Sequence, residues 1–329
     1  MKFVTFAYKN SISYGILEEE TLFDLPAAAR SLSGEGQQCP YAEGGQFPPD
    51  LLSLLDLEEN FPKAAAWVLD KVKEKGIVSS GSGQAEKYKV LAVSGVTLKA
   101  PLPSPRKVFC VAENYTEHIA EANREDLEHK ESSIPRIFIK PVSNTMIGPE
   151  EPIIVSKNAV VTDWEAELAV VIGKRCKYVP AQNALEYVAG YTIFNDVSER
   201  DLTIKNRTVS SDRDRFFAWL NGKWLDSFAP TGPYFVTQDE VGDPQDLNIK
   251  LWVNDQEKQN SNTSCMIDSV VSLIEYLSQI VTLEPGDIIA TGTPSGVGFP
   301  KGEKLIDGDI VEIEIEKIGR LRNPVKNEG

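Results

Sequence analysis

The sequence predicts a strand-rich α+β fold arranged in two domains. Many short apolar runs have the length and residue pattern of β-strands, whereas only a few segments have the spacing of an amphipathic helix. Strands that outnumber helices in this way are typical of α+β domains and argue against a doubly wound parallel sheet. The chain has 329 residues, which corresponds to roughly two domains.

Residues 1–103 are predicted to form a smaller N-terminal domain that contains both strands and helices. Three prolines between Leu98 and Pro105 are typical of a stiff linker, so we expect the boundary near residue 103. In chain order, the expected elements are two short strands over residues 1–25 with a turn at 9–11, a loop over 31–50, helices over 49–57 and 61–75, the second ending at Gly76, and a flexible stretch over 79–87.

Residues 104–329 are predicted to form a second domain that is richer in strands. A helix is expected to begin at Asn114, because asparagine caps helices well and Glu117 follows three residues later, as in a capping box. Another helix is expected over 267–281, where apolar residues recur on one face. Strands are expected over residues 107–112, 137–140, 153–156, 168–172, 191–194, 234–236, 249–253, 288–291 and 310–315.

The composition excludes several classes of function. The chain carries 34 basic and 49 acidic residues, a formal net charge of −15, which argues against nucleic acid as a partner. Its four cysteines include no CxxC pair, so neither a zinc ribbon nor a disulfide framework is expected, and two histidines are too few for a histidine-rich metal site. Neither a signal peptide nor a membrane-spanning apolar run is visible, so we expect a cytoplasmic protein that does not bind membranes.

The strongest candidate site lies at the start of the apolar run that follows Asp163. In an extended strand, Glu165 and Glu167 point to the same face. Two like charges at the buried end of a strand are costly unless a cation lies between them, and Mg²⁺ or Mn²⁺ prefers carboxylate oxygens. Asp196, which follows the predicted strand 191–194, is a candidate third ligand. Taken singly, the glutamates could also be solvated or paired with basic residues, and Asp196 could close an Asx turn.

A second candidate is the pair of His118 and Glu121, which are neighbours on a helix because they are three residues apart. A carboxylate that holds one imidazole nitrogen fixes the tautomer and leaves the other nitrogen free to act as a general base. The alternative is a surface pair of little consequence. His129 lies in a polar stretch and is assigned to no site.

Two further segments are weaker candidates. The loop 291–298, TGTPSGVG, matches neither a Walker A loop nor GxGxxG, but it offers backbone N–H groups and the Thr293 hydroxyl to an anion, unless it is a plain turn. Lys223 lies in an Asn-Gly-Lys loop and, taken alone, would be solvated. No GxSxG motif is present to support a serine hydrolase.

The order of these segments resembles the fumarylacetoacetate hydrolase family. The resemblance extends from about residue 105 to 325, whereas residues 1–100 show it only weakly. The motifs that carry it are NYxxHxxE at 114–121, Lys-Pro at 140–141, ExELAVVIG at 165–173, GYxxxNDxSxRD at 190–201, Gly-Lys at 222–223 and GDIIxTGTPxGVG at 286–298.

The resemblance implies a mixed β-sandwich roll in the C-terminal domain, usually assembled as a homodimer. It also implies a divalent metal, Mg²⁺ or Mn²⁺, with Ca²⁺ sometimes found in crystals. Carried over motif by motif, it implies metal ligands at Glu165, Glu167 and Asp196, catalytic residues at His118, Glu121 and Lys223, and substrate-binding residues at Tyr115, Lys140 and Thr293.

The activity implied by the resemblance is hydrolysis of a C–C bond in a small anionic 2-oxo or β-diketo acid of the acylpyruvate or fumarylacetoacetate type. The metal would stabilise the enolate that leaves, while His118, held by Glu121, would take a proton from the attacking water. The alternatives are decarboxylation of a β-keto acid of the oxaloacetate type, isomerisation at the same site, or metal-dependent ligand binding without turnover.

This sequence departs from the common family pattern at three positions. Glu113 stands where relatives often carry Arg or Lys, Glu199 where alanine is common, and Thr203 where glutamine is common. We expect these positions to affect substrate recognition and not metal binding. They leave the substrate open, and a basic residue from the segment 205–215 could compensate.

Overall fold

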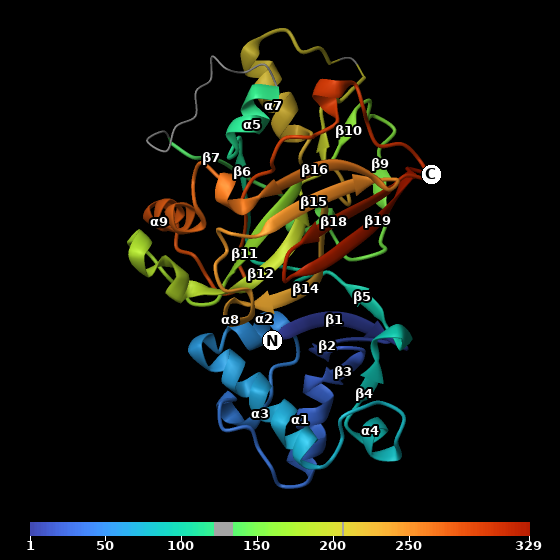
Figure 1. Cartoon of the computed structure of the whole chain (residues 1–329), viewed down its shortest axis with the longest axis vertical. Helices are drawn as coiled ribbons and strands as arrows, with labels where there is room; N and C mark the ends of the chain where they lie inside the picture. The colour runs from blue at the N-terminus through green and yellow to red at the C-terminus, as the bar shows by residue number, and fades with distance from the viewer. Residues whose placement is uncertain (122–133, 206) are drawn as a thin grey trace.

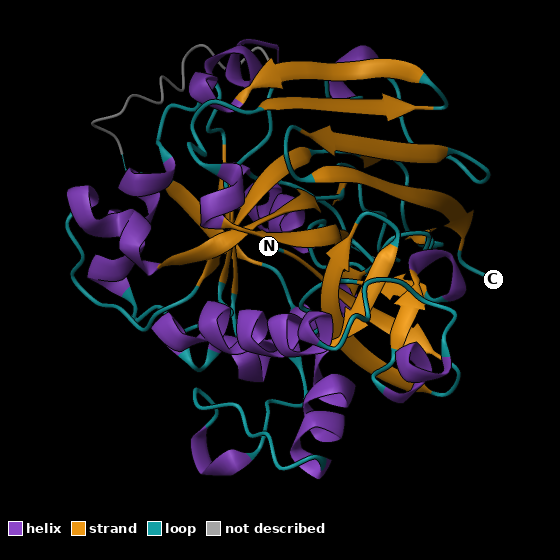
Figure 2. Ribbon diagram, turned by 60° about the horizontal axis from the view of Figure 1, so that its bottom comes forward, coloured by secondary structure: helices purple, strands orange, loops and turns teal. Residues whose placement is uncertain are grey.

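The strands form one large mixed sheet and a separate five-stranded sheet (Figures 1 and 2). The computed structural model describes residues 1–121, 134–205 and 207–329, and His129 lies outside these ranges. Within them, none of the helices combines the length and apolar character that crossing a bilayer requires. The two sheets confirm the strand-rich α+β fold that the sequence predicts.

The large sheet runs through both parts of the chain. Its order is β4-β3-β2-β1-β14-β12-β11-β17-β6-β7, with β5 paired to β1 and β8 paired to β14. The strands are β1 (Lys2–Tyr8), β2 (Ser11–Glu18), β3 (Thr21–Asp24), β4 (Val90–Ala92), β5 (Thr97–Lys99), β6 (Val108–Ala112), β7 (Arg136–Ile139), β8 (Met146–Ile147), β11 (Ala166–Ile172), β12 (Val188–Asn195), β14 (Ala229–Thr237) and β17 (Ile288–Ala290).

The five-stranded sheet has the order β16-β15-β18-β19-β9, and a short two-stranded ribbon pairs β10 with β13. Figure 1 shows β15, β16, β18 and β19 side by side next to β11 and β12. These strands are β9 (Ile153–Val155), β10 (Thr162–Asp163), β13 (Ser198–Glu199), β15 (Asn248–Val253), β16 (Gln256–Asn262), β18 (Ile310–Ile315) and β19 (Gly319–Asn327).

The helices lie around the sheets, with α1 and α3 at the N-terminal end of the molecule and α5 and α7 at the opposite end (Figure 1). They are α1 (Leu25–Gly34), α2 (Leu51–Leu55), α3 (Phe61–Glu74), α4 (Gly83–Lys87), α5 (Thr116–Glu121), α6 (Val142–Thr145), α7 (Asp212–Asn221), α8 (Gln238–Val241) and α9 (Val270–Ile280).

Strand β11 separates two hydrophobic cores, and this explains why all of its residues are buried. Leu168 and Val170 pack in the core that includes Ile249 and Leu251 of the five-stranded sheet. The alternate residues Ala169 and Val171 pack in the core that holds α1 and α3. Glu167, the second residue of β11, belongs to this second alternation, so one charged side chain lies near the start of a strand that is otherwise apolar on both faces.

The N-terminal part differs from the prediction in several places, and strands β4 and β5 are also missing from the prediction. Residues 1–25 contain three strands instead of two, and helix α1 extends to residue 34, into the expected loop 31–50. Helix α1 forms because Asp24 caps it and apolar side chains such as Leu32 enter the core. Helix α4 lies in the stretch expected to be flexible, where Ser82 caps it and Ala85 is buried.

In the C-terminal part, strands are present in all the predicted segments, with shifted ends, but other elements are missing from the prediction. Strand β16 has the polar sequence QEKQNSN, and helix α7 has apolar residues but buries none of them. Pairing with β15 and capping by Ser211 support them instead.

The N-terminal strands are continuous with the C-terminal ones through the pairing of β1 with β14. Phe3 of β1 and Phe235 of β14 pack in the same core, with ring centroids 5.7 Å apart. The domain division near residue 103 stays a prediction, and this shared sheet is the feature that an independent N-terminal domain would lose.

Candidate functional site

Three carboxylates meet where β11 begins and β12 ends. Glu165 directly precedes β11, Glu167 is its second residue, and Asp196 directly follows β12. The antiparallel register places Ala166 opposite Asn195, which brings the three side chains together. One oxygen of each carboxylate lies within 4.8 Å of those of the other two, and all three residues are buried.

The donor set fits a hard divalent cation. Glu167 Oε2 accepts a hydrogen bond from Gly292 N at 2.9 Å, but its buried Oε1 has no hydrogen-bond partner among the described residues. Burial, together with the charges of Asp196 and Glu165, raises the pKa of Glu167 well above its ordinary range. A cation such as Mg²⁺ or Mn²⁺ takes oxygen ligands of this kind and would satisfy the orphaned oxygen.

Two buried lysines lie against the carboxylates. Lys223 Nζ donates to Glu165 Oε2 at 2.8 Å and to Asp196 Oδ2 at 2.7 Å, while Lys140 Nζ donates to Asp196 Oδ1 and, at 2.9 Å, to Val197 O. Burial lowers the pKa of Lys140 although Asp196 opposes this, whereas at Lys223 the two carboxylates outweigh burial and raise the pKa. The interpretation of Lys223 as a solvated loop residue is wrong.

Arg200 completes the charged cluster and was missing from the sequence-based site. Its guanidinium donates to Glu165 Oε1 at 2.5 Å and to Asp163 Oδ2 at 3.1 Å. Burial raises the pKa of Glu165, but Lys223 and Arg200 outweigh it and hold the pKa below the ordinary value. Arg200 lies in the motif GYxxxNDxSxRD at 190–201, so the motif was a signal for it, although its spacing did not indicate which carboxylates it would contact.

The three departures from the family pattern have local partners. The Glu199 carboxylate accepts hydrogen bonds from Val160 N, Val161 N and the Thr162 hydroxyl at 3.0, 2.6 and 2.8 Å. It therefore anchors the segment that leads into β10 and Asp163. Glu113 forms an ion pair with Arg136, and Thr203 N donates to Asn158 O at 2.9 Å.

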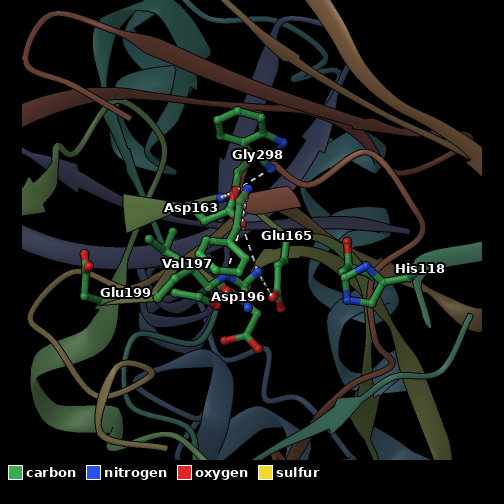
Figure 3. Close-up of polar contacts among 12 residues, drawn as sticks. His118, Asp163, Glu165, Asp196, Val197, Glu199 and Gly298 are labelled. Carbon is green, nitrogen blue, oxygen red and sulfur yellow. Dashed lines mark hydrogen bonds and ion pairs between the residues drawn. The ribbon is translucent and has the colours of Figure 1, made fainter. Parts of the chain in front are cut away.

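His118 and Glu121 form the expected pair on α5. His118 Nδ1 lies 2.9 Å from Glu121 Oε1, and Glu121 Oε2 accepts from Gly296 N at 2.8 Å. Both side chains are mostly buried, at 14% and 16% exposed, which argues against an ordinary surface pair. Figure 3 shows the imidazole on one side of Glu165, with Asp163 and Glu199 on the other.

The loop 291–298 holds acidic side chains of the protein itself. Backbone N–H groups of Gly292, Gly296 and Gly298 donate to Glu167, Glu121 and Asp163 respectively. The first two glycines have φ of 92° and 107°, and a Cβ at Gly296 would lie 2.0 Å from Lys258 O, so a side chain there is excluded. The loop therefore aligns three carboxylates of the protein, while the binding of an anionic ligand by this loop stays a prediction. 

Asn114 and Tyr115 precede α5, which begins at Thr116. The prediction that Asn114 caps this helix is wrong, because its side chain donates to Asp268 O and Thr291 O at 2.9 and 2.8 Å and accepts from Asp268 N. It thereby ties the start of α5 to the glycine loop. The Tyr115 hydroxyl is buried with no hydrogen-bond partner in the described ranges, and burial, then the charge of Glu167, raises its pKa.

Comparison with known proteins identifies relatives of this chain. Residues 107–326 match the family model described as the fumarylacetoacetate (FAA) hydrolase C-terminal domain. The chain is 37% identical over 256 residues to the mitochondrial oxaloacetate tautomerase of Xenopus laevis, covering 77% of this chain and 75% of that one. It is 36% identical to the 2,4-didehydro-3-deoxy-L-rhamnonate hydrolase of Sphingomonas sp. SKA58, covering 87% and 95%.

Solved structures agree over the whole length. The maleylpyruvate hydrolase of Sphingobium sp. SYK-6, in complex with manganese(II) ion and pyruvate, has a TM-score of 0.71 and 26% identity, with both chains fully covered. The fumarylacetoacetate hydrolase of Exiguobacterium antarcticum has a TM-score of 0.72 and 30% identity, again with full coverage of both chains. The relatives named here are enzymes. The family model, the sequence identities and the shared fold agree that this chain belongs to the fumarylacetoacetate hydrolase family.

Proposed function

We propose that the protein is a divalent-metal-dependent hydrolase that cleaves a C–C bond in β-diketo acids of the acylpyruvate or fumarylacetoacetate type. The observation that carries this proposal is the His118–Glu121 pair, which lies beside the cluster of Glu165, Glu167 and Asp196. A general base next to a cation site is the arrangement that hydrolysis of such a substrate requires.

The three carboxylates would hold Mg²⁺ or Mn²⁺, which supplies a Lewis acid for the 2-oxo group when it is bound. Glu121 occupies His118 Nδ1, so Nε2 is the nitrogen that would take a proton from water. Gly296 N fixes the other oxygen of Glu121, which prevents the carboxylate from turning away. The protonated Lys223 ammonium would offset negative charge that develops on a substrate oxygen.

A second candidate is the interconversion of keto and enol forms of a small β-keto acid, or its decarboxylation. The oxaloacetate tautomerases of Xenopus laevis and Bos taurus, 37% and 44% identical to this chain, favour it. In tautomerisation His118 Nε2 would move a proton between carbon and oxygen, and no attacking water is needed. The two candidates therefore differ in what the same imidazole deprotonates.

The test uses chelator-treated protein to which Mg²⁺ or Mn²⁺ is restored, with acylpyruvates and oxaloacetate as substrates. Hydrolysis releases a carboxylic acid and pyruvate, decarboxylation releases CO₂, and tautomerisation changes only the enol absorbance. We expect hydrolysis by the wild type and a loss of about 10²- to 10⁴-fold in His118→Ala. Glu117→Ala, an exposed change on the same helix, is the control.

Each other outcome has a distinct meaning. Full hydrolytic turnover in His118→Ala would remove the pair from the mechanism. Turnover of oxaloacetate alone would favour the second candidate. Metal-dependent binding of pyruvate without turnover of any substrate would contradict the enzyme and indicate a ligand-binding protein.

We also propose a homodimer. The exposed aromatic side chains of Phe216 and Phe217 on α7, at 56% and 48%, and of Trp224 beyond it support an interface between copies. Light scattering should give twice the 36.3 kDa of one chain, and a mass of one chain would contradict the proposal.

A further inference from the structure

Gln259 is a buried polar residue that joins the glycine loop to the carboxylate cluster. It lies on β16, is 1% exposed, and its amide makes three hydrogen bonds. Gln259 Oε1 accepts from Ala166 N at 2.9 Å, and Gln259 Nε2 donates to Pro294 O and to Thr293 Oγ1, both at 2.8 Å. Ala166 lies between Glu165 and Glu167, so this amide connects the strand that carries the two glutamates with the loop 291–298.

The backbone partners determine which way the amide points. The N–H of Ala166 can only donate and the carbonyl of Pro294 can only accept, so a flipped amide would lose both hydrogen bonds. The Nε2 group therefore faces Thr293. Because that group can only donate, the Thr293 oxygen must act as the acceptor.

This arrangement leaves the Thr293 hydroxyl hydrogen available to an acceptor other than Gln259. No acceptor for it is found in the part of the chain that the structure describes. Thr293 is 3% exposed and follows Gly292, whose N–H holds Glu167. A buried donor of this kind is costly unless a ligand accepts it.

We propose that Gln259 is a positioning residue that makes the Thr293 hydroxyl an obligate donor toward the carboxylate of a 2-oxo acid. This inference rests on the proposed function, because it needs an anionic acid bound at the cluster. Without the Nε2 group nothing orients the hydroxyl before the acid binds, so binding must order it and is weakened. Gln259 acts through Thr293 and does not itself touch the substrate.

The test is a double-mutant cycle read by calorimetric binding of pyruvate to manganese-loaded protein. Thr293→Val removes the hydroxyl at nearly constant shape, and Gln259→Met removes the amide. We expect each to weaken binding about 10- to 100-fold, the range of one hydrogen bond to a charged group. In the Thr293→Val background, Gln259→Met should add less than about twofold, because residues that act as one unit are not additive.

Two further variants sharpen the cycle. Gln259→Glu keeps the length of the side chain but accepts the hydroxyl hydrogen, so it should bind pyruvate at least as weakly as Gln259→Met. Thr293→Ser keeps the donor and should bind as the wild type does. The matched control is Gln256→Met, the same substitution at an exposed position of the same strand, and it should change nothing.

Thermal unfolding of each metal-free variant separates positioning from a purely structural role. If Gln259→Met weakens pyruvate binding equally with and without the Thr293 hydroxyl, the inference is overturned. Should Gln259→Met fail to fold, Gln259→Glu replaces it in the cycle under the same criterion. A wild type that binds no 2-oxo acid contradicts the proposed function, whereas a wild type that binds pyruvate with additive losses contradicts this inference alone.

Discussion

Charged side chains that pair with one another are buried at the candidate site but exposed in the N-terminal part. At the site, Lys140, Lys223 and Asp196 are at most 2% exposed, and both lysines donate hydrogen bonds to Asp196. In the N-terminal part, Glu35 forms ion pairs with Lys75 and Lys87, side chains that are 28% to 55% exposed. One chain therefore contains both a buried charge cluster and an ordinary solvated one.

The difference indicates which cluster is kept for function. Exposed ion pairs contribute little to stability, and many contribute nothing measurable. Buried charges lose hydration that their partners restore only in part, so apolar residues in their place are often neutral or stabilising. Among the residues that the structure describes, Glu167 Oε1 of this cluster still has no hydrogen-bond partner, although two lysines and an arginine contact the cluster. Such an arrangement is best explained by a ligand that it binds.

We expect the largest effect from a substitution within the buried cluster itself. Asp196→Asn removes one ligand charge, so we expect Mn²⁺ affinity and turnover to fall by at least about 100-fold, because even residues behind metal ligands are worth 10- to 100-fold. Titration calorimetry and the substrate assays measure both. Asp201→Asn, an exposed change five residues along, should leave both unchanged, and an active Asp196→Asn enzyme would contradict the ligand assignment.

The second prediction compares the two clusters directly. Lys140→Met removes one of the two buried lysines that pair with Asp196, so the free energy of unfolding should fall, by up to about 3–5 kcal/mol. Lys75→Met, in the exposed cluster, should cause little change. Urea unfolding of the metal-free variants measures both. Equal effects at the two positions would show that burial does not distinguish the clusters.

The third prediction concerns the metal. Mg²⁺ or Mn²⁺ at about 100 times its dissociation constant should stabilise the folded protein by about 2.7 kcal/mol, because only the folded state assembles the three carboxylates. Thermal unfolding with and without chelator measures this. The stabilisation should disappear in Asp196→Asn, and its persistence there would place the cation elsewhere.

The smallest effect concerns a buried carboxyl in the N-terminal part. Burial raises the pKa of Asp24 from its ordinary 3.8, although Ala27 N–H and the Ser13 hydroxyl oppose it. The folded state then binds the proton more tightly than the unfolded state, so this residue's contribution to stability falls as pH rises from about 4 through the raised pKa. Asn accepts both hydrogen bonds at one oxygen, so Asp24→Asn should remove this dependence. Urea unfolding of both proteins across this pH range tests it, and identical curves would contradict it.

Patterns along the chain were sufficient for several features of the fold and site. Apolar runs located β11, β12 and β17 because a strand buried on both faces leaves a continuous hydrophobic signal. The spacing of His118 and Glu121 predicted their contact because a helix brings residues three apart together. The polar strand β16 and the helix α7, which buries no residue, lacked such a signal, because neighbours and caps support them.

What the sequence determined by itself was local: a strand-rich chain, the common face of Glu165 and Glu167, and the His118–Glu121 pair on α5. Only the tertiary structure decided which charges oppose those carboxylates. Lys140, Arg200 and Lys223 come from separate segments, and Gln259 reaches the site from a strand of the other sheet. Spacing along a chain specifies neighbours within one element, whereas the partner of a buried charge is set by which elements pack together, since burial requires compensation from any segment that the fold brings within reach.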